Sequence, residues 1–210
     1  MIPAFPVYLF DLDGTIMDSA ADICGAVETV LASRGRTEVP HEVLRSYIGR
    51  HLYEEFQELG FPHEDIDQMI VEYRAIYPAR GHVNTCVYPG IAETMSRLGG
   101  RKSTATTKGT PTTRAVLEQF GLVRHFDHVQ GTDGFPAKPA PDVLLNAIEA
   151  LGARLQDCLF VGDSPADMEA GRRAGIRTCA VAWGYGDPKQ LRKFEPDFWV
   201  NTPHELLADG

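Results

Sequence analysis

The sequence lacks the cysteine spacing of a zinc ribbon or of a redox pair. Its four cysteines, Cys24, Cys86, Cys158 and Cys179, form no CxxC pair. Cys158 and Cys179 fall in apolar runs, which is typical of small core residues. A metal centre built on thiolates is therefore not indicated, and we expect the chain to reside in a reducing cytoplasm.

The sequence also lacks an apolar run long enough to span a bilayer. No basic region followed by an apolar stretch marks the amino terminus, so we expect no signal peptide. Positive charge is scarce, because 20 lysines and arginines face 29 acidic residues, for a net charge of −9. Without a long basic stripe, neither nucleic acid nor a membrane is an expected partner. Any anionic ligand would need local positive charge, from a metal ion, a lysine or a helix amino terminus.

Strand-like and helix-like segments alternate in both flanks of the chain. This alternation predicts an α/β fold, a Rossmann-like, doubly wound parallel sheet with helices on both faces. Between the flanks, four helical stretches follow one another with no strand, at residues 20–34, 41–47, 51–59 and 63–79. We therefore predict a core domain of residues 1–17 plus 88–210, and an inserted all-helical cap domain of residues 18–87.

Two acids, Asp11 and Asp13, directly follow a short apolar run, Val7–Phe10, that predicts a buried strand. In open α/β sheets, ligands bind beyond the carboxyl ends of the strands. Carboxylates at that place can bind a divalent cation, attack an electrophile or transfer a proton. Taken alone, the pair also fits an ordinary acidic turn or part of a calcium loop.

Three further segments place polar groups where the same site needs them. STATTKG, residues 103–109, runs from a strand into hydroxyl groups and a lysine, although alone it is an ordinary polar strand end. AKPAPD places Lys138 before two prolines and a helix, which can hold a cation rigidly, although most lysines are simply solvated. VGDSPAD ends a buried strand at Asp163, with Asp167 four residues later.

Carboxylates that converge at one sheet edge repel one another unless a cation neutralises them. Asp11, Asp13 and Asp163 are expected to converge in this way, and Mg²⁺ prefers such oxygen ligands. In chain order, DLDGT, a hydroxyl-ended strand, a lysine before a helix and GDSxxD resemble the haloacid dehalogenase superfamily of phosphohydrolases. The resemblance covers essentially the whole chain, and segments such as YPGI and VAWGYG look most like its phosphoglycolate phosphatase-like members.

The resemblance implies a Mg²⁺-dependent phosphatase that acts on a small phosphate monoester, with 2-phosphoglycolate as the best single candidate. The reaction would pass through an aspartyl-phosphate. The resemblance implies that Asp11 is the nucleophile and that Asp13 is the general acid and base. It also implies that the Thr106 hydroxyl binds the phosphoryl group and that Lys138 is the stabilising cation. The implied metal-binding residues are Asp11, Asp13 (through its backbone carbonyl), Asp163 and Asp167, of which Asp167 acts directly, through water or as an orienting group.

The second motif departs from the family pattern. Members often carry Asn after its hydroxyl residue, whereas Thr107 and then Lys108 stand there in this chain. Either Thr106 or Thr107 can face the phosphate, and we favour Thr106. Thr107 and Lys108 are candidate substrate-binding residues. In the cap, RSYIGRHL resembles the loop that reaches the active site in relatives, so Arg50 either meets a substrate carboxylate or second phosphate, or is an exposed helix arginine.

Other functions share parts of this pattern. Phosphomutases of the β-phosphoglucomutase type use the same covalent step, but they usually carry Val after DxDG, and Thr15 favours a hydrolase. Pyrophosphate and sugar phosphates are alternative substrates. Dehalogenases lack the second acid, which Asp13 supplies here, and a non-enzymatic scaffold is disfavoured because every motif keeps its charged residue. The expected partner is a small phosphorylated metabolite, and both a monomer and a homodimer fit the sequence.

Overall fold

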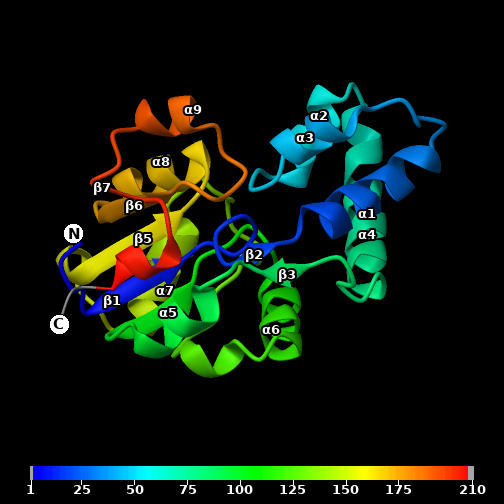
Figure 1. Cartoon of the computed structure of the whole chain (residues 1–210). Helices are drawn as coiled ribbons and strands as arrows, with labels where there is room; N and C mark the ends of the chain where they lie inside the picture. Colours follow the sequence, from blue (N-terminus) through cyan, green and yellow to red (C-terminus); the bar gives the residue numbers. More distant parts are fainter. Residues whose placement is uncertain (1, 208–210) are drawn as a thin grey trace.

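The structure is a computed structural model that describes residues 2–207. A five-stranded parallel sheet forms its centre, with helices on both faces (Figure 1). This arrangement confirms the predicted α/β fold. In sheet order, the strands are β4 (Arg101–Thr104), β1 (Val7–Phe10), β5 (Cys158–Gly162), β6 (Arg177–Val181) and β7 (Phe198–Val200).

The strand order creates a crevice beside β1. Counted along the chain, the five core strands lie in the order 2-1-3-4-5. The topology reverses between β1 and β5, and open α/β sheets bind ligands at such a point. Phe10 pairs in register with Thr104 of β4 and Val161 of β5. The residues that follow these strands therefore reach the same edge of the sheet together.

The alternating side chains of β1 pack against two different layers of helices. Tyr8 and Phe10 join a cluster with residues of α5 and α6 on one face, whereas Val7 and Leu9 pack with α7 and α8 on the other. All four side chains are buried, as in central parallel strands generally. The helices of the core are α5 (Ile91–Arg97), α6 (Thr110–Gln119), α7 (Asp142–Ala150), α8 (Pro165–Ala174) and α9 (Pro188–Arg192), with 3₁₀ turns η1 (Val123–His125), η2 (Leu155–Asp157) and η3 (Pro203–Leu206).

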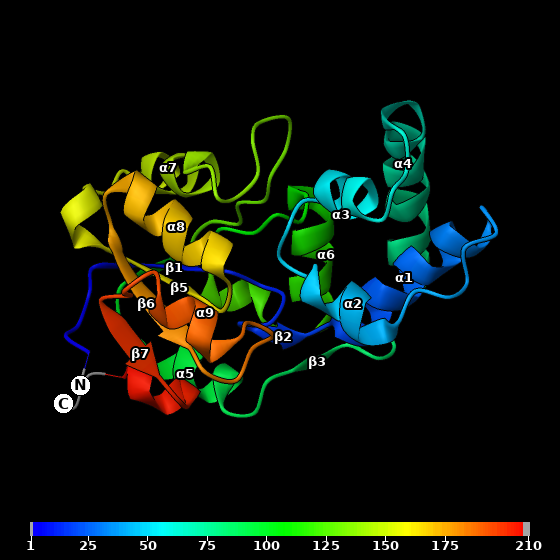
Figure 2. The same ribbon diagram turned by 90° about the horizontal axis from the view of Figure 1, so that it is seen from above.

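Of the five helices between β1 and β4, the first four form a separate group (Figures 1 and 2). Each contributes to one apolar cluster, through Val27, Leu44, Phe56 and Met69 respectively. The helices begin and end within two residues of the predicted stretches, because their apolar faces repeat at helical spacing. They are α1 (Ala20–Ala32), α2 (His41–Ser46), α3 (Leu52–Glu58) and α4 (His63–Ala79).

A short antiparallel pair of strands, β2 (Met17–Asp18) and β3 (Cys86–Val87), joins this helical group to the core. The sequence does not predict the pair, because two residues are too few to show a period. The first predicted boundary between core and cap, after residue 17, lies within β2, and the second, after residue 87, directly follows β3. Residues 1 and 208–210 of the predicted core range lie outside the described part of the chain. Throughout residues 2–207, no helix combines the length and apolar character that crossing a membrane requires.

Candidate active site

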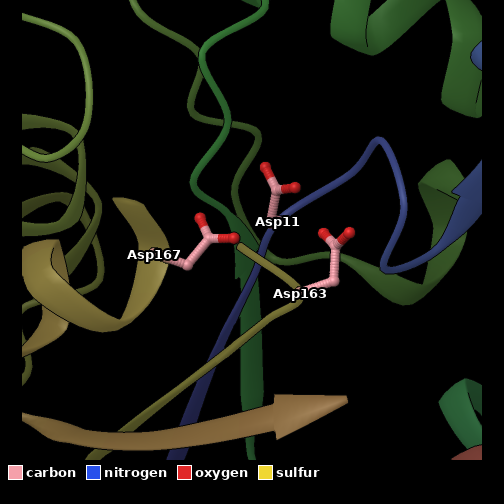
Figure 3. A group of neighbouring side chains, drawn as sticks. All are labelled: Asp11, Asp163 and Asp167. Carbon is pink, nitrogen blue, oxygen red and sulfur yellow. The ribbon is translucent and has the colours of Figure 1, made fainter. Parts of the chain in front are cut away.

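Three carboxylates meet at the reversal point of the sheet (Figure 3). Asp11 directly follows β1, Asp163 directly follows β5, and Asp167 lies in the first turn of α8. One oxygen from each carboxylate lies within 4.8 Å of the others, and all three residues are buried. The Asp13 carboxylate, which follows the same strand as Asp11, is not part of this group.

Lys138 supplies the positive charge that joins two of these acids. Its Nζ lies 2.7 Å from Asp11 Oδ1 and 2.6 Å from Asp167 Oδ1, with the lysine side chain fully buried. Burial raises the pKa of Asp11 to about 7, although the charge of Lys138 opposes the shift. Burial alone would lower the pKa of Lys138, but attraction to Asp11 and Asp167 raises it above its ordinary value. The lysine therefore stays charged.

Asp163 is held in place by two donors from neighbouring loops. The Thr15 hydroxyl donates to Oδ1 at 3.1 Å, and the Tyr185 backbone N–H donates to Oδ2 at 2.7 Å. Burial, together with the charges of Asp11 and Asp167, raises the pKa of Asp163 well above its ordinary value. A cation that approaches Asp11 and Asp163 would meet hard oxygen ligands with excess negative charge.

Asp167 uses both of its oxygens on protein groups. Oδ1 contacts Lys138, and Oδ2 accepts hydrogen bonds from the N–H and hydroxyl of Ser164, at 2.9 and 2.7 Å. Ser164 in turn accepts from the Asp167 backbone N–H, which completes a capping box at the start of α8. This geometry suits an orienting residue that fixes Lys138 better than it suits a direct metal ligand.

Asp13 lies on the side of the site that faces the group of helices α1–α4. The Ser19 hydroxyl donates to its Oδ1 at 2.5 Å, and Lys108 Nζ lies 3.0 Å from its Oδ2. The same Nζ lies 3.1 Å from the Tyr77 hydroxyl and 4.1 Å from the Tyr77 ring centre. Against the effect of burial, attraction to Asp13 raises the pKa of Lys108. Lys108 thus forms a second, separate ion pair within the core, and its hydrogen bond to Tyr77 links that pair to α4.

The other predicted site residues take different positions. The strand from which the STATTKG segment continues, β4, ends at Thr104, so Thr106 and Thr107 lie in the loop that follows it. The buried Thr106 hydroxyl accepts a hydrogen bond from the Lys108 N–H, and Thr107 lines a cavity beside it. Arg50 lies in the turn between α2 and α3, where its guanidinium pairs with Glu58 at 2.5 Å.

A cavity of about 320 Å³ lies between the core and the helical group. Asp13, Thr107 and Lys108 line it from the core side. On the side of the helical group, the lining includes Arg50 in the turn between α2 and α3, Glu55 of α3, and the tyrosine pair of α4, Tyr73 and Tyr77. The cavity volume falls in the range typical of small-molecule sites.

Sequence reasoning did not identify Ser19 or Tyr185 as site residues. The Tyr185 hydroxyl accepts a hydrogen bond from the Ser19 N–H at 2.7 Å and donates to Asp18 Oδ1 at 2.9 Å. Tyr185 therefore ties the loop that holds Asp163 to the chain entering α1. The VAWGYG segment contains Tyr185, but in the sequence it indicated only the resemblance to the family and no contact of this residue.

Gly14 is a position where the backbone must stay free of a side chain. Its φ is +94°, and a Cβ there would lie 2.3 Å from Asp163 Oδ2. Gly35 has a comparable φ of +71° with nothing within 4 Å of a Cβ. Both Gly→Ala changes incur a left-handed backbone cost of about 1–2 kcal/mol. We expect only Gly14→Ala to lower kcat, by about tenfold or more. Steady-state assays with Gly35→Ala as the control measure this effect, and equal kcat values in the two variants would contradict the prediction.

Comparisons with known proteins agree with the geometry. The model of the haloacid dehalogenase-like hydrolase family matches residues 8–181. The chain is 35% identical over 208 residues to the phosphoglycolate phosphatase of Aquifex aeolicus, covering 96% of this chain and 94% of that protein. It is 32% identical to phosphoglycolate phosphatase 1 of Pseudomonas aeruginosa, covering 95% and 77%. The crystal structure of a predicted phosphatase from Clostridium acetobutylicum superposes with a TM-score of 0.91 at 30% identity, covering 97% of each chain.

Proposed function

This chain belongs to the haloacid dehalogenase-like hydrolases and is a phosphatase of that family, and from this premise we propose that it hydrolyses 2-phosphoglycolate with Asp11 as nucleophile and Mg²⁺ as cofactor. The observation that carries the proposal is the buried contact of Asp11 with Lys138, at 2.7 Å, beside Asp163. The names of the two bacterial relatives support the choice of substrate.

The residues present fit a magnesium ion. Asp11 and Asp163 offer buried carboxylate oxygens, and Lys138 is the lysine that contacts the group of three acids. These two acids, with the backbone carbonyl of Asp13, are the proposed ligands, and Asp167 is proposed to orient Lys138. When bound, Mg²⁺ would neutralise phosphate charge and lower the pKa values of the acids beside it.

The proposed chemistry has two steps. In the first, an Asp11 oxygen bonds to phosphorus while the ester bond breaks, and Asp13 gives its proton to the leaving oxygen. In the second, Asp13 takes a proton from water, which attacks phosphorus and releases phosphate and free Asp11. Lys138 holds Asp11 and balances the charge of the transferring group, while Ser19 and Lys108 orient Asp13.

A phosphate-release assay tests the proposal. The panel is 2-phosphoglycolate, 2-hydroxyethyl phosphate, pyrophosphate and a hexose phosphate, each with and without Mg²⁺. We expect the highest kcat/KM for 2-phosphoglycolate, and only with Mg²⁺. A higher value for another member would replace the proposed substrate, and an isomerised sugar phosphate without free phosphate would indicate a mutase.

Mg²⁺ is expected to stabilise the fold through Asp163. At a concentration 100 times its Kd, a ligand that binds only the folded state raises the free energy of unfolding by about 2.7 kcal/mol, or the Tm by about 5–10 °C. Asp163→Asn should abolish most of this rise in thermal denaturation experiments. Asp67→Asn, an exposed change on α4, is the matched control and should keep it. A full Mg²⁺ shift in Asp163→Asn would contradict the assignment.

A further inference from the structure

One atom of the core contacts both the proposed acid and the group of helices α1–α4. Lys108 Nζ lies 3.0 Å from Asp13 Oδ2, and it donates a hydrogen bond of 3.1 Å to the Tyr77 hydroxyl. The Tyr77 ring centre lies 4.1 Å from the same Nζ, within the range of a cation–π contact. Because Tyr77 belongs to the last turn of α4, a change in the position of α4 reaches the Lys108 amine directly.

Both ends of this contact are held within their own part of the molecule. In the core, the Lys108 N–H donates to Thr106 Oγ1 at 3.3 Å, and the Lys108 carbonyl accepts from the Thr132 N–H at 3.1 Å. In the helical group, Tyr77 is 2% exposed, and its ring stacks on that of Tyr73 with ring centres 5.6 Å apart. The Lys108 backbone and the Tyr77 ring therefore cannot move without breaking these contacts.

The side chain of Lys108 is flexible by comparison. An unrestrained lysine samples many rotamers, because its ammonium lies at the end of four rotatable carbons. The Tyr77 hydroxyl and ring restrict the amine to a position beside Asp13 Oδ2, while the Ser19 hydroxyl holds Oδ1 at 2.5 Å. Since the Lys108 and Asp13 side chains are only 8% and 10% exposed, water competes little for either group. Tyr77 thus contributes to the direction in which the Asp13 carboxyl faces.

We infer that Tyr77 is a positioning residue that acts through Lys108, so that protonation of the leaving oxygen depends on α4. The inference rests on the proposed chemistry, in which Asp13 gives its proton to the leaving oxygen while Asp11 bonds to phosphorus and the ester bond breaks. The carboxylate that remains on Asp13 pairs with the Lys108 ammonium. A general acid contributes about 10²- to 10⁴-fold to a rate, and a misdirected acid loses much of this contribution.

Substrates with different leaving groups provide the test. 2-Phosphoglycolate and ethyl phosphate both release an alkoxide oxygen, which must take a proton as its bond to phosphorus breaks. Acetyl phosphate matches ethyl phosphate in size, but its leaving acetate is stable as an anion and needs no proton. The ratio kcat/KM covers only the steps up to the transfer to Asp11, so it excludes the later attack of water.

Tyr77→Phe removes the hydroxyl and keeps the ring. We expect this variant to lower kcat/KM by about tenfold for 2-phosphoglycolate and for ethyl phosphate, because a hydrogen bond to a charged group is lost. The value for acetyl phosphate should change less than about twofold. Tyr53→Phe makes the same chemical change elsewhere in the helical group, where the hydroxyl contacts His63 at the surface, and should leave all three values unchanged.

A double variant tests whether Tyr77 acts through Lys108. Lys108→Met should lower kcat/KM for the two alkyl esters by about 10²-fold, because one oxygen of Asp13 is no longer held. In this background Tyr77→Phe should cause no further decrease, because the amine that its hydroxyl holds is absent. A further tenfold decrease in the double variant would show that Tyr77 acts independently of Lys108, and would overturn the inference.

Asp13→Asn separates this inference from the proposed function. It should lower kcat/KM for the two alkyl esters far more than for acetyl phosphate. If it does so, but Tyr77→Phe lowers all three values equally or none of them, the inference alone is wrong. A decrease in Tyr77→Phe for 2-phosphoglycolate without one for ethyl phosphate would indicate a contact with the substrate carboxylate, and would also overturn the inference.

The proposed function can fail in two recognisable ways. If Asp13→Asn lowers all three values equally, or if the parent enzyme hydrolyses neither alkyl ester, the proposed acid and the inference fail together. If the parent enzyme hydrolyses ethyl phosphate but not 2-phosphoglycolate, only the proposed substrate is wrong, and ethyl phosphate and acetyl phosphate still decide the role of Tyr77.

Discussion

Replacing Asp11 by Asn is expected to lower kcat for phosphate release by about 10⁴-fold or more. An amide cannot form the proposed aspartyl-phosphate, whereas its size and shape match those of the carboxylate. Lys138 keeps its second partner, Asp167, at 2.6 Å. The variant also removes a carboxylate whose burial raises its pKa to about 7. We therefore expect the fold to persist, with Tm no more than a few degrees below that of the parent.

Single-turnover and steady-state phosphate release, measured beside thermal denaturation, check this result. Asp67→Asn again serves as the control, because it makes the same chemical change at an exposed position. Retention of more than about a tenth of the parent kcat by Asp11→Asn would exclude Asp11 as nucleophile. A water attack directly on phosphorus would then be the better mechanism.

Replacing Lys138 by Met is expected to damage both catalysis and stability. The lysine is fully buried between Asp11 and Asp167, so its loss leaves two buried carboxylates without their countercharge beside a third carboxylate. Breaking a buried pair in this way costs about 3–5 kcal/mol, which for a chain of this size lowers Tm by about 6–20 °C. The rate should also fall by about 10²-fold or more, because positioning and charge compensation dominate phosphoryl transfer.

A second substitution separates these two effects. Adding Asp167→Asn to Lys138→Met removes one of the two buried charges that lack a countercharge. The double variant should therefore recover part of the decrease in Tm and none of the lost activity. Lys189→Met, at an exposed position of α9, should change neither quantity. An unchanged Tm in Lys138→Met would mean that the buried ion pairs contribute nothing to stability.

Local patterns in the sequence predicted much of the fold. Continuous apolar character marked β1 and β5, and helical spacing marked the four cap helices, because burial imposes a period on each element. The same logic placed Asp11 and Asp163 at one edge of the sheet, and these acids do lie together. Lys138, predicted from its position before a helix, contacts Asp11 directly.

The sequence did not predict which residues far apart in the chain contact one another. The partner of Asp13 is Lys108, which is 95 residues away, and Lys108 also contacts Tyr77 of α4. The sequence left Arg50 open between a substrate contact and a helix surface, whereas the structure places it in a turn, paired with Glu58. No pattern around Glu55 distinguishes it from the exposed glutamates near it in α3.

The sequence alone determined which elements form and which ends of the strands carry acids, because hydrophobic period and turn chemistry act over a few residues. It thereby also determined the family and the class of reaction. Only the tertiary structure decided which charged groups pair. Lys138 contacts both Asp11 and Asp167, whereas Lys108 pairs with Asp13 and contacts Tyr77 of α4. The physical reason is that burial and pairing of a charge depend on groups far away in the chain, which meet only after the sheet and helices have packed.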